Sequence, residues 1–263
     1  MPDAAPPILV SEDGAVAQLV LNRPRQGNSL SAGLVAALRE ALAAFGTRRD
    51  IKVIVISGAG GRIFSAGHDL NEFAGQADAA FLAADFAGIA ALMQQVMAQP
   101  QIVIAKVEGV ATAAGCELVA ACDLALASSA ARFGVPGVNI GFWCHTPQVP
   151  LSRSVGPKQA MMMLATGKLF PADHALKIGL VNSVHEPEDL DGAVAALCET
   201  IAAKATSVIR RGKASFRRQL ELPVPAAYEF VRGEALDHVQ RPDAQEGIAA
   251  FLEKRAPAWP EDV

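Results

Sequence analysis

The chain has 263 residues, of which 51% are hydrophobic and 19% are charged, and its formal net charge is −4. This length suits one large domain, or one domain with a terminal appendage, and a domain of this size buries roughly 75% of its unfolded surface. The negative charge excludes a general affinity for nucleic acid. No apolar run reaches the roughly 20 residues of a membrane span, and the N-terminus lacks the basic and apolar regions of a secretory signal. We therefore expect a cytoplasmic protein without nucleic-acid or membrane partners.

Strand and helix patterns alternate along the first two thirds of the chain. Ile8–Val10 and Val16–Leu21 flank the turn signal Glu12–Gly14, which predicts a hairpin. Ser31 predicts the N-cap of a helix that runs to about Phe45. Later patterns predict strands at 53–57, 102–107, 124–127 and 180–184, and helices at 78–97, 115–121, 157–165 and 172–178. The last third carries only helical patterns, so the sequence predicts an α/β protein with a helical C-terminal region.

The four cysteines show neither a CxxC pair nor the regular spacing of a disulfide framework. We interpret them as reduced thiols, with Cys116 and Cys122 as small buried hydrophobic residues. No group of His, Cys and Asp has the spacing of metal ligands, so we expect no metal site.

Residues 106–123 contain the most informative pattern in the chain. An apolar strand-like run meets the small residues of 111–115, and a helical pattern follows. Glu117 is the only charge between Gly109 and Cys122, and a lone carboxylate is costly to bury unless it is used or paired. Small residues let a ligand approach the backbone, and free N–H groups at a helix start can bind developing negative charge. One acid beside exposed amides is the minimum for acid–base chemistry on a carbonyl compound.

This segment and an earlier loop resemble the enoyl-CoA hydratase/isomerase family, also called the crotonase family. The AGxD loop of the family reads Ala66-Gly67-His68-Asp69 here, and its GGGxE helix start reads Ala113-Ala114-Gly115-Cys116-Glu117. Further landmarks follow in the family's order: Asn22–Pro24 with Asn28, Phe133–Pro136, Thr166-Gly167 and Gly179–Val181. The resemblance implies a crotonase-type spiral of ββα units over residues 1–200, which holds the active site, and a helical trimerisation region over residues 201–263.

The resemblance also implies roles for three residues in catalysis. The backbone N–H groups of His68 and Ala114 would stabilise a thioester enolate, and Glu117 would be the acid–base group, with a pKa raised by desolvation. Alanine at 114 is tolerable if its φ stays negative. The imidazole of His68 could instead act as a base, although the family uses the amide at this position. Asp69 is expected to cap or orient the short helix that follows it.

Coenzyme A is implied as part of the thioester substrate, and no permanently bound cofactor is expected. The family pattern places the thioester and its CoA along Ala66, His68, Asp69, Leu70 and Ala114, with Arg25 near the adenine end. A basic run either meets the CoA phosphate from a neighbouring subunit of a homotrimer or hexamer, or forms a solvated helix face; it comprises Arg210, Arg211, Lys213, Arg217 and Arg218.

Two departures from the family pattern bear on the activity. Hydratases carry a second glutamate after the proline of the FGxPE motif, and this chain has Gly137 there. We predict an enoyl-CoA hydratase. Hydration needs one group to activate water and another to deliver a proton, and Gly137 supplies no carboxylate. This leaves two alternatives, an isomerase or a weakly active CoA-thioester-binding protein. The next stretch, 141–149, looks closest to the enoyl-CoA hydratase domain-containing protein 3 subgroup. Its Trp143, Cys144 and His145 could line the acyl pocket, or Cys144 and His145 could form a nucleophilic pair.

Overall fold

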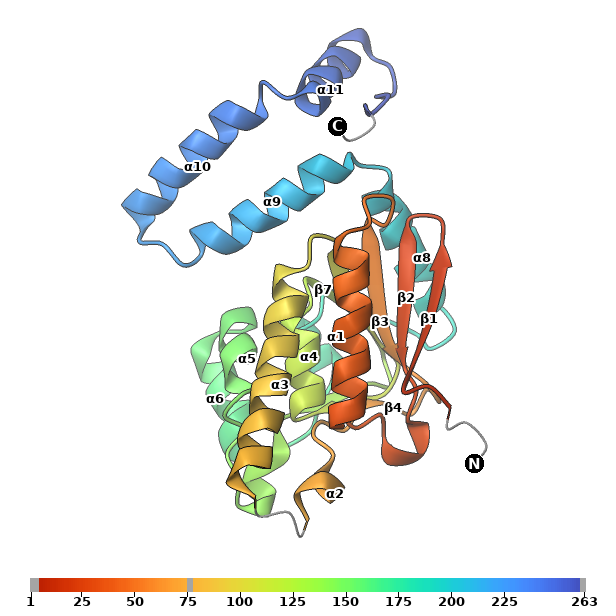
Figure 1. Cartoon of the computed structure of the whole chain (residues 1–263), viewed down its shortest axis with the longest axis vertical. Coiled ribbons are helices and arrows are strands. Elements are labelled where there is room, and N and C mark those ends of the chain that lie inside the picture. Colours follow the sequence, from red (N-terminus) through yellow and green to blue (C-terminus); the bar gives the residue numbers. More distant parts are fainter. Residues whose placement is uncertain (1–4, 75–77, 261–263) are drawn as a thin grey trace.

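The computed structural model describes residues 5–74 and 78–260, and its strands form two sheets (Figure 1). The six-stranded sheet has the order β1 (Ile8–Asp13), β2 (Val16–Leu21), β3 (Val53–Gly58), β5 (Ile102–Val107), β7 (Leu124–Ser128) and β10 (Ser183–His185). The four-stranded sheet has the order β4 (Ile63–Ser65), β6 (Val110–Thr112), β8 (Arg132–Gly134) and β9 (Phe170–Pro171).

From β3 to β8, successive strands alternate between the two sheets. The hairpin β1–β2 is antiparallel, as predicted, whereas β2, β3, β5, β7 and β10 pair in parallel. The pairs β3–β4, β5–β6 and β7–β8 each place one strand in the large sheet and the next in the small sheet, and helices follow each pair. This order confirms the predicted α/β class and the spiral of ββα units.

Helices cover the large sheet on both faces, with α1 (Ala32–Gly46) against β1 and β2 and α8 (Leu190–Ala202) against β3, β7 and β10. The helices between them in the chain are α2 (Leu70–Phe73), α3 (Ala79–Ala98), α4 (Ala114–Ala121), α5 (Gln148–Ser154), α6 (Pro157–Thr166) and α7 (Ala172–Lys177), with short 3-10 turns η1 (Pro24–Gln26) and η2 (Pro136–Ile140). Figure 1 shows α1, α3 and α4 side by side over one face. Ser31 Oγ accepts a hydrogen bond from the Leu34 N–H at 3.3 Å, which confirms the predicted cap of α1.

Strand β3 is buried along its whole length because it contributes to two apolar clusters. Ile54 and Ile56 belong to the main core, and Val53 and Val55 belong to a second cluster with residues of α8. Such continuous burial is typical of a parallel strand that is covered on both faces, as the sequence predicted.

Among the described residues, helix α3 is the single helix that passes a test of length and hydropathy for a membrane span. By length and hydropathy alone, its 20 residues could cross a membrane. In this fold, however, Ile89, Leu92, Met93 and Val96 are buried in the main core, where α3 contacts α1 and α4. Helix α3 is therefore placed as a core helix of a globular domain.

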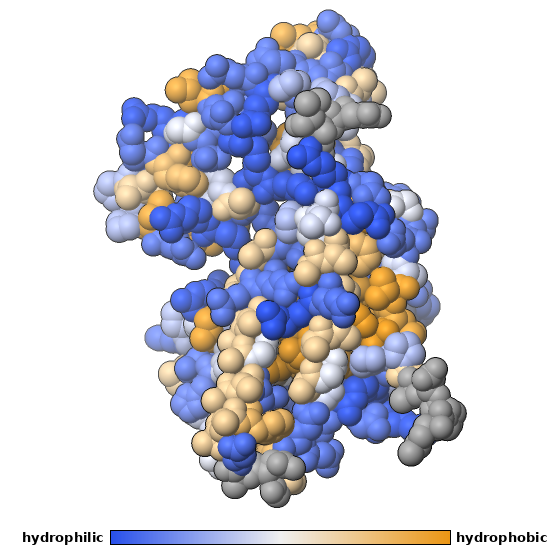
Figure 2. Space-filling model, viewed as in Figure 1, coloured by the Kyte–Doolittle hydropathy of each residue, from blue (hydrophilic) through white to orange (hydrophobic). Residues whose placement is uncertain are grey.

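Helices α9 (Thr206–Gln219), α10 (Val224–His238) and α11 (Pro242–Glu253) form an arm that extends beyond one end of the sheets (Figure 1). The arm is anchored by Lys213, which donates to the Gln101 carbonyl at 2.8 Å and pairs with the Asp123 carboxylate. Lys213 is only 8% exposed, so the basic run of α9 is not a uniformly solvated face. Figure 2 shows apolar patches between hydrophilic residues on this arm, and α10 buries none of its described residues within the chain.

Candidate active site

Helix α2 and the start of α3 lie at the end of the domain opposite the arm (Figure 1). Residues of both helices line a cavity of about 250 Å³. Its lining is mainly apolar, with a few polar groups, and consists of Ala66, His68, Leu70, Phe73, Phe86, Ala113, Pro136, Gly137, Asn139, Ile140, Phe142, Cys144, His145, Thr146 and Pro147. Ala66, His68 and Leu70 from the predicted CoA-contacting set therefore face this cavity. A second, more open groove between β1 and α1 contains none of the predicted site residues.

Two glycines bring the AGxD loop and the start of α4 together. Gly67 has φ +92°, and a Cβ there would lie 2.7 Å from Ala113 Cβ and 2.9 Å from Ala114 N. A Cβ on Gly115 would lie 2.2 Å from the Ser65 carbonyl oxygen. Only glycine permits these approaches, so the backbone following Gly67 is held against the backbone of Ala114.

The N–H group of Ala114 lacks an acceptor within its own helix. Ala114 is the first residue of α4, and the first N–H groups of a helix have no i−4 carbonyl. On the other loop, the Leu30 N–H donates to the Gly67 carbonyl at 2.7 Å and fixes the peptide that ends in the His68 nitrogen. The two amides named by the sequence therefore come from backbone segments in direct contact.

An unusual backbone conformation occurs at Ala113, one residue before Ala114. Ala114 is helical, as the substitution of glycine requires, whereas Ala113 has φ +49° and ψ −123°. A non-glycine residue in such a region costs on the order of 1–3 kcal/mol and persists only where its surroundings enforce it. The Ala113 N–H donates to the Gly134 carbonyl at 3.0 Å, and its carbonyl accepts from the Glu117 N–H. The strained backbone of Ala113 therefore lies at the wall of the cavity.

Glu117 is buried, with 2% of its surface exposed. Its Oε2 accepts a hydrogen bond from Thr146 Oγ1 at 2.9 Å, and Thr146 lines the cavity. Burial raises the pKa of Glu117 from 4.5 to about 7, against the opposing effect of the Thr146 hydrogen bond. The carboxyl group can therefore both donate and accept a proton near neutral pH, and the raised pKa is the one expected from the sequence.

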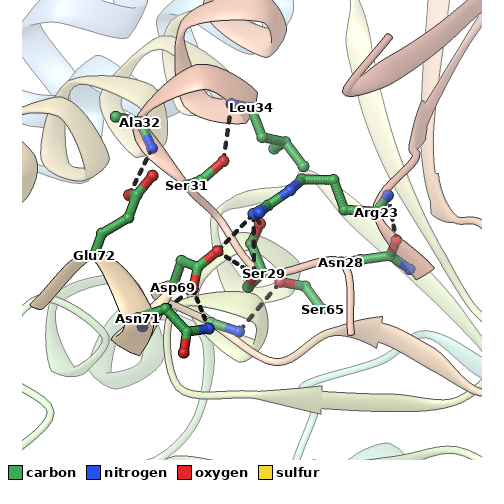
Figure 3. Close-up of polar contacts among 11 residues, drawn as sticks. Arg23, Asn28, Ser29, Ser31, Ala32, Leu34, Ser65, Asp69, Asn71 and Glu72 are labelled. Carbon is green, nitrogen blue, oxygen red and sulfur yellow. Dashed lines mark hydrogen bonds and ion pairs between the residues drawn. The ribbon is translucent and has the colours of Figure 1, made fainter. Parts of the chain in front are cut away.

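Asp69 has a full set of partners inside the protein (Figure 3). Its carboxylate accepts from Arg23 at 2.8 Å, from Ser29 Oγ at 3.1 Å and from the Asn71 N–H at 3.2 Å, and it caps α2. Burial raises the pKa of Asp69, but these hydrogen bonds outweigh burial and hold the pKa below its usual range. Asp69 thus caps the short helix that follows it, as predicted. Arg25, predicted near the adenine end of CoA, lies exposed on η1 outside the cavity lining.

Gly137 is a position with no room for a side chain. A Cβ there would lie 2.3 Å from the Phe142 carbonyl oxygen and 2.8 Å from Cys144 Sγ. Cys144 fills the space, and burial raises the pKa of its thiol, which disfavours the nucleophilic Cys–His alternative. Cys144 and His145 line the cavity as predicted, whereas Trp143 is not among the lining residues and donates to Gln148 Oε1 at 3.0 Å.

Sequence reasoning did not single out Thr146, which donates to Glu117, nor a buried acid beside this cavity. Asp85, on α3, places Oδ2 3.4 Å from Nε2 of His68, and the side chains of Asp85 and His68 are 3% and 11% exposed. Asp85 is a lone acid among apolar helix residues. The criterion that singled out Glu117, an isolated carboxylate in an apolar segment, would also have found Asp85.

The stacked sheets, the ββα spiral and the apolar pocket beside α4 define the crotonase fold. The chain belongs to the enoyl-CoA hydratase/isomerase family, whose model matches residues 11–262. It is 39% identical over 257 residues to mitochondrial enoyl-CoA hydratase domain-containing protein 3 of Danio rerio, covering 98% of this chain and 89% of the relative. It is 31% identical to the crotonyl-CoA hydratase of Syntrophomonas wolfei, covering 94% and 95% of the two chains.

Solved structures agree with this family assignment. An enoyl-CoA hydratase from Mycobacterium smegmatis superposes with a TM-score of 0.93 at 41% identity, over 97% of this chain and 99% of the other. Human enoyl Coenzyme A hydratase domain-containing protein 3 superposes with a TM-score of 0.93 at 38% identity, over 96% and 100%. These matches confirm the predicted fold and the resemblance to that subgroup.

The predicted cytoplasmic location is wrong by the same comparisons. The fish, rat, mouse and human relatives of the domain-containing protein 3 type are all named as mitochondrial proteins. The prediction depended on reduced cysteines and on the lack of a secretory signal, and neither criterion tests for an organellar protein.

Proposed function

We propose that this chain is an enoyl-CoA hydratase, which adds water across the C2=C3 bond of an acyl-CoA thioester. The observation that carries the proposal is Glu117, a buried carboxyl group with a pKa of about 7, close to a cavity beside two backbone amides. The thioester carbonyl would accept hydrogen bonds from the N–H groups of His68 and Ala114. These donors stabilise the negative charge that develops on the carbonyl oxygen as water adds to C3. Glu117 would then transfer a proton to C2.

The cavity supports a short acyl chain as substrate. Its volume of about 250 Å³ lies below the roughly 300–1,000 Å³ of pockets that hold drug-sized ligands. Phe73, Phe86 and Phe142 provide an apolar wall, which suits hydrocarbon better than a charged group. The name of the Syntrophomonas relative, a crotonyl-CoA hydratase, agrees with a four-carbon acyl group.

The test is the hydration of crotonyl-CoA, followed by the loss of enoyl-thioester absorbance, in the wild type and in Glu117→Gln. We expect the variant to lose 100-fold or more in kcat, which corresponds to about 2.7 kcal/mol of barrier. Glu199→Gln, at an exposed position on α8, is the matched control and should retain the wild-type rate. A wild type that binds the thioester but does not hydrate it would contradict the proposal.

An enoyl-CoA isomerase is the second candidate, and the packing at Gly137 favours it. Moving a double bond needs only one base that carries a proton between C2 and C4, and Gly137 cannot carry a second carboxylate. Conversion of a 3-enoyl-CoA to the 2-enoyl isomer, without hydration of crotonyl-CoA, would establish this activity. Binding without turnover of either substrate would instead favour a CoA-thioester-binding protein.

We also propose a homotrimer, or a hexamer of two trimers, with the arm at the subunit contacts. Apolar side chains on α10 and α11 remain exposed in the single chain, among them Tyr228 at 73%, Leu236 at 66% and Phe251 at 81%. Such groups are more stable when a partner covers them. Sedimentation equilibrium would measure the assembly, and a monomer at micromolar concentration would contradict this proposal.

A further inference from the structure

His68 and Asp85 form a buried pair at the wall of the cavity. Nε2 of His68 lies 3.4 Å from Oδ2 of Asp85, and neither atom has a hydrogen-bond partner among the described residues. The ring of His68 packs against the rings of Phe73 and Phe86, at centroid distances of 5.5 and 5.4 Å. These apolar neighbours shield the pair from bulk water.

His68 also lines the cavity, so its imidazole borders the ligand space. Nε2 faces Asp85, so proton exchange with a ligand in the cavity would use the other nitrogen, Nδ1. A carboxylate near Nε2 favours the tautomer that is protonated on that nitrogen, and this tautomer has a free lone pair on Nδ1. The pair is thus arranged to present a neutral base to the cavity.

We next ask whether another titratable group around the pocket could form such an acid–base pair. On the α2 side, Asp69 is paired with Arg23, and Glu72 accepts from the Ala32 N–H at 3.0 Å. The remaining groups are Glu117 from α4 and Cys144 and His145 from the loop after η2. Burial raises the pKa of Cys144, and His145 contacts the ring of Phe142. Among the described residues, no carboxylate lies within ion-pair distance of His145.

We propose that the imidazole of His68, positioned by Asp85, is the second acid–base group of this site and activates the water. This inference rests on the proposed hydratase activity. Gly137 cannot supply the group, and His68 would already hold the thioester carbonyl through its own amide, so its side chain emerges beside the acyl carbons. Burial lowers the pKa of His68 and raises that of Asp85, which favours a neutral imidazole at neutral pH.

The proposed step balances as follows. Nδ1 of His68 takes one proton from water as the oxygen–C3 bond forms, and the C2=C3 electrons move onto the thioester oxygen. Protonated Glu117 then gives its proton to C2 as the enolate collapses. After product release, His68 loses its proton to solvent and Glu117 takes one up. The rate therefore requires neutral His68 and protonated Glu117, which predicts a bell-shaped pH dependence.

The experiment compares kcat, KM and the pH profile for crotonyl-CoA in wild type, His68→Gln, Asp85→Asn and His145→Gln, with butyryl-CoA affinity as the measure of binding. In His68→Gln, kcat should fall about 100-fold or more. This variant should also lack the low-pH limb of the profile, which is the fall in rate as His68 becomes protonated. It should still bind butyryl-CoA, because the backbone amide remains. Asp85→Asn should lose on the order of 10-fold in kcat and shift that limb to lower pH, since the carboxylate that stabilises the imidazolium is gone. His145→Gln should keep the limb.

The outcomes separate this inference from the proposed function. If the wild type hydrates crotonyl-CoA and Glu117→Gln does not, a normal rate and low-pH limb in His68→Gln would overturn the role of the pair. Loss of the limb in His145→Gln alone would overturn it as well. A wild type that binds butyryl-CoA but never hydrates crotonyl-CoA would overturn the hydratase itself.

Discussion

Restoring the family glutamate at Gly137 should damage the protein. In Gly137→Glu, the new Cβ would lie 2.3 Å from the Phe142 carbonyl oxygen and 2.8 Å from Cys144 Sγ. The tighter collision involves backbone, so a rotamer change cannot relieve it. Overpacking of this kind costs roughly 1–3 kcal/mol. At about 2–4 °C per kcal/mol for a chain of this size, the melting temperature should fall by roughly 2–12 °C.

The assay pairs thermal unfolding with crotonyl-CoA hydration. Gly192→Glu is the matched control, because the Cβ there meets no atom within 4 Å and the site is exposed on α8. We expect the control to melt no lower than the wild type, because glycine is an unfavourable residue in a helix. The double variant Gly137→Glu with Cys144→Ala should remain destabilised, since the collision with Phe142 persists. A Gly137→Glu variant that melts like the wild type and hydrates crotonyl-CoA faster would refute the steric reasoning.

Three further predictions concern stability and are checked by thermal unfolding. The pKa of Glu117 is raised from 4.5 to about 7, so the stability of the native state falls as pH rises through this range; Glu117→Gln should exceed the wild type by on the order of 3 kcal/mol at pH 8 and by much less at pH 5. Ala113 has a φ of +49°, which glycine adopts without strain, so Ala113→Gly should stabilise the native state by up to about 2 kcal/mol. The helical control Ala120→Gly should destabilise the native state by about 1 kcal/mol. Asp123→Asn leaves buried Lys213 without its carboxylate and should cost about 3–5 kcal/mol; an unchanged melting temperature would contradict each expectation.

Local signals in the sequence predicted the long elements correctly. The hairpin β1–β2, the cap at Ser31 and the doubly buried β3 follow from turn chemistry, capping and an apolar run. The strands β4, β6 and β8 were missed because three residues are too few to show a period of two. The last strand of the large sheet was expected at 180–184, but β10 begins at Ser183, because Leu180 and Val181 donate their N–H groups to the Ala175 carbonyl of α7.

The site was only partly predictable for a related reason. Glu117 and the two amides lie in segments whose own composition is unusual, so a single stretch of sequence indicates them. The contact of Asp85 with His68 joins α3 to a loop seventeen residues earlier, and the obstruction at Gly137 depends on the path of the chain at Phe142. Both features depend on tertiary packing, which a pattern within one segment does not encode.

The close contacts at Gly67 and Gly115 make the position of the amide donors independent of the chemistry of the side chain at residue 68. The positions of the two amide donors are set by the close approach of backbone to backbone at Gly67 and Gly115, and the donor at residue 68 is a main-chain N–H group that any side chain but proline leaves available. Residue 68 can therefore change its chemistry while the donor beneath it stays in place. A ligand also meets donors that are already ordered, so little of its binding free energy is lost in organising them. Such a scaffold can acquire new reactions by exchanging one pocket side chain, because recognition of the carbonyl group is carried by the main chain.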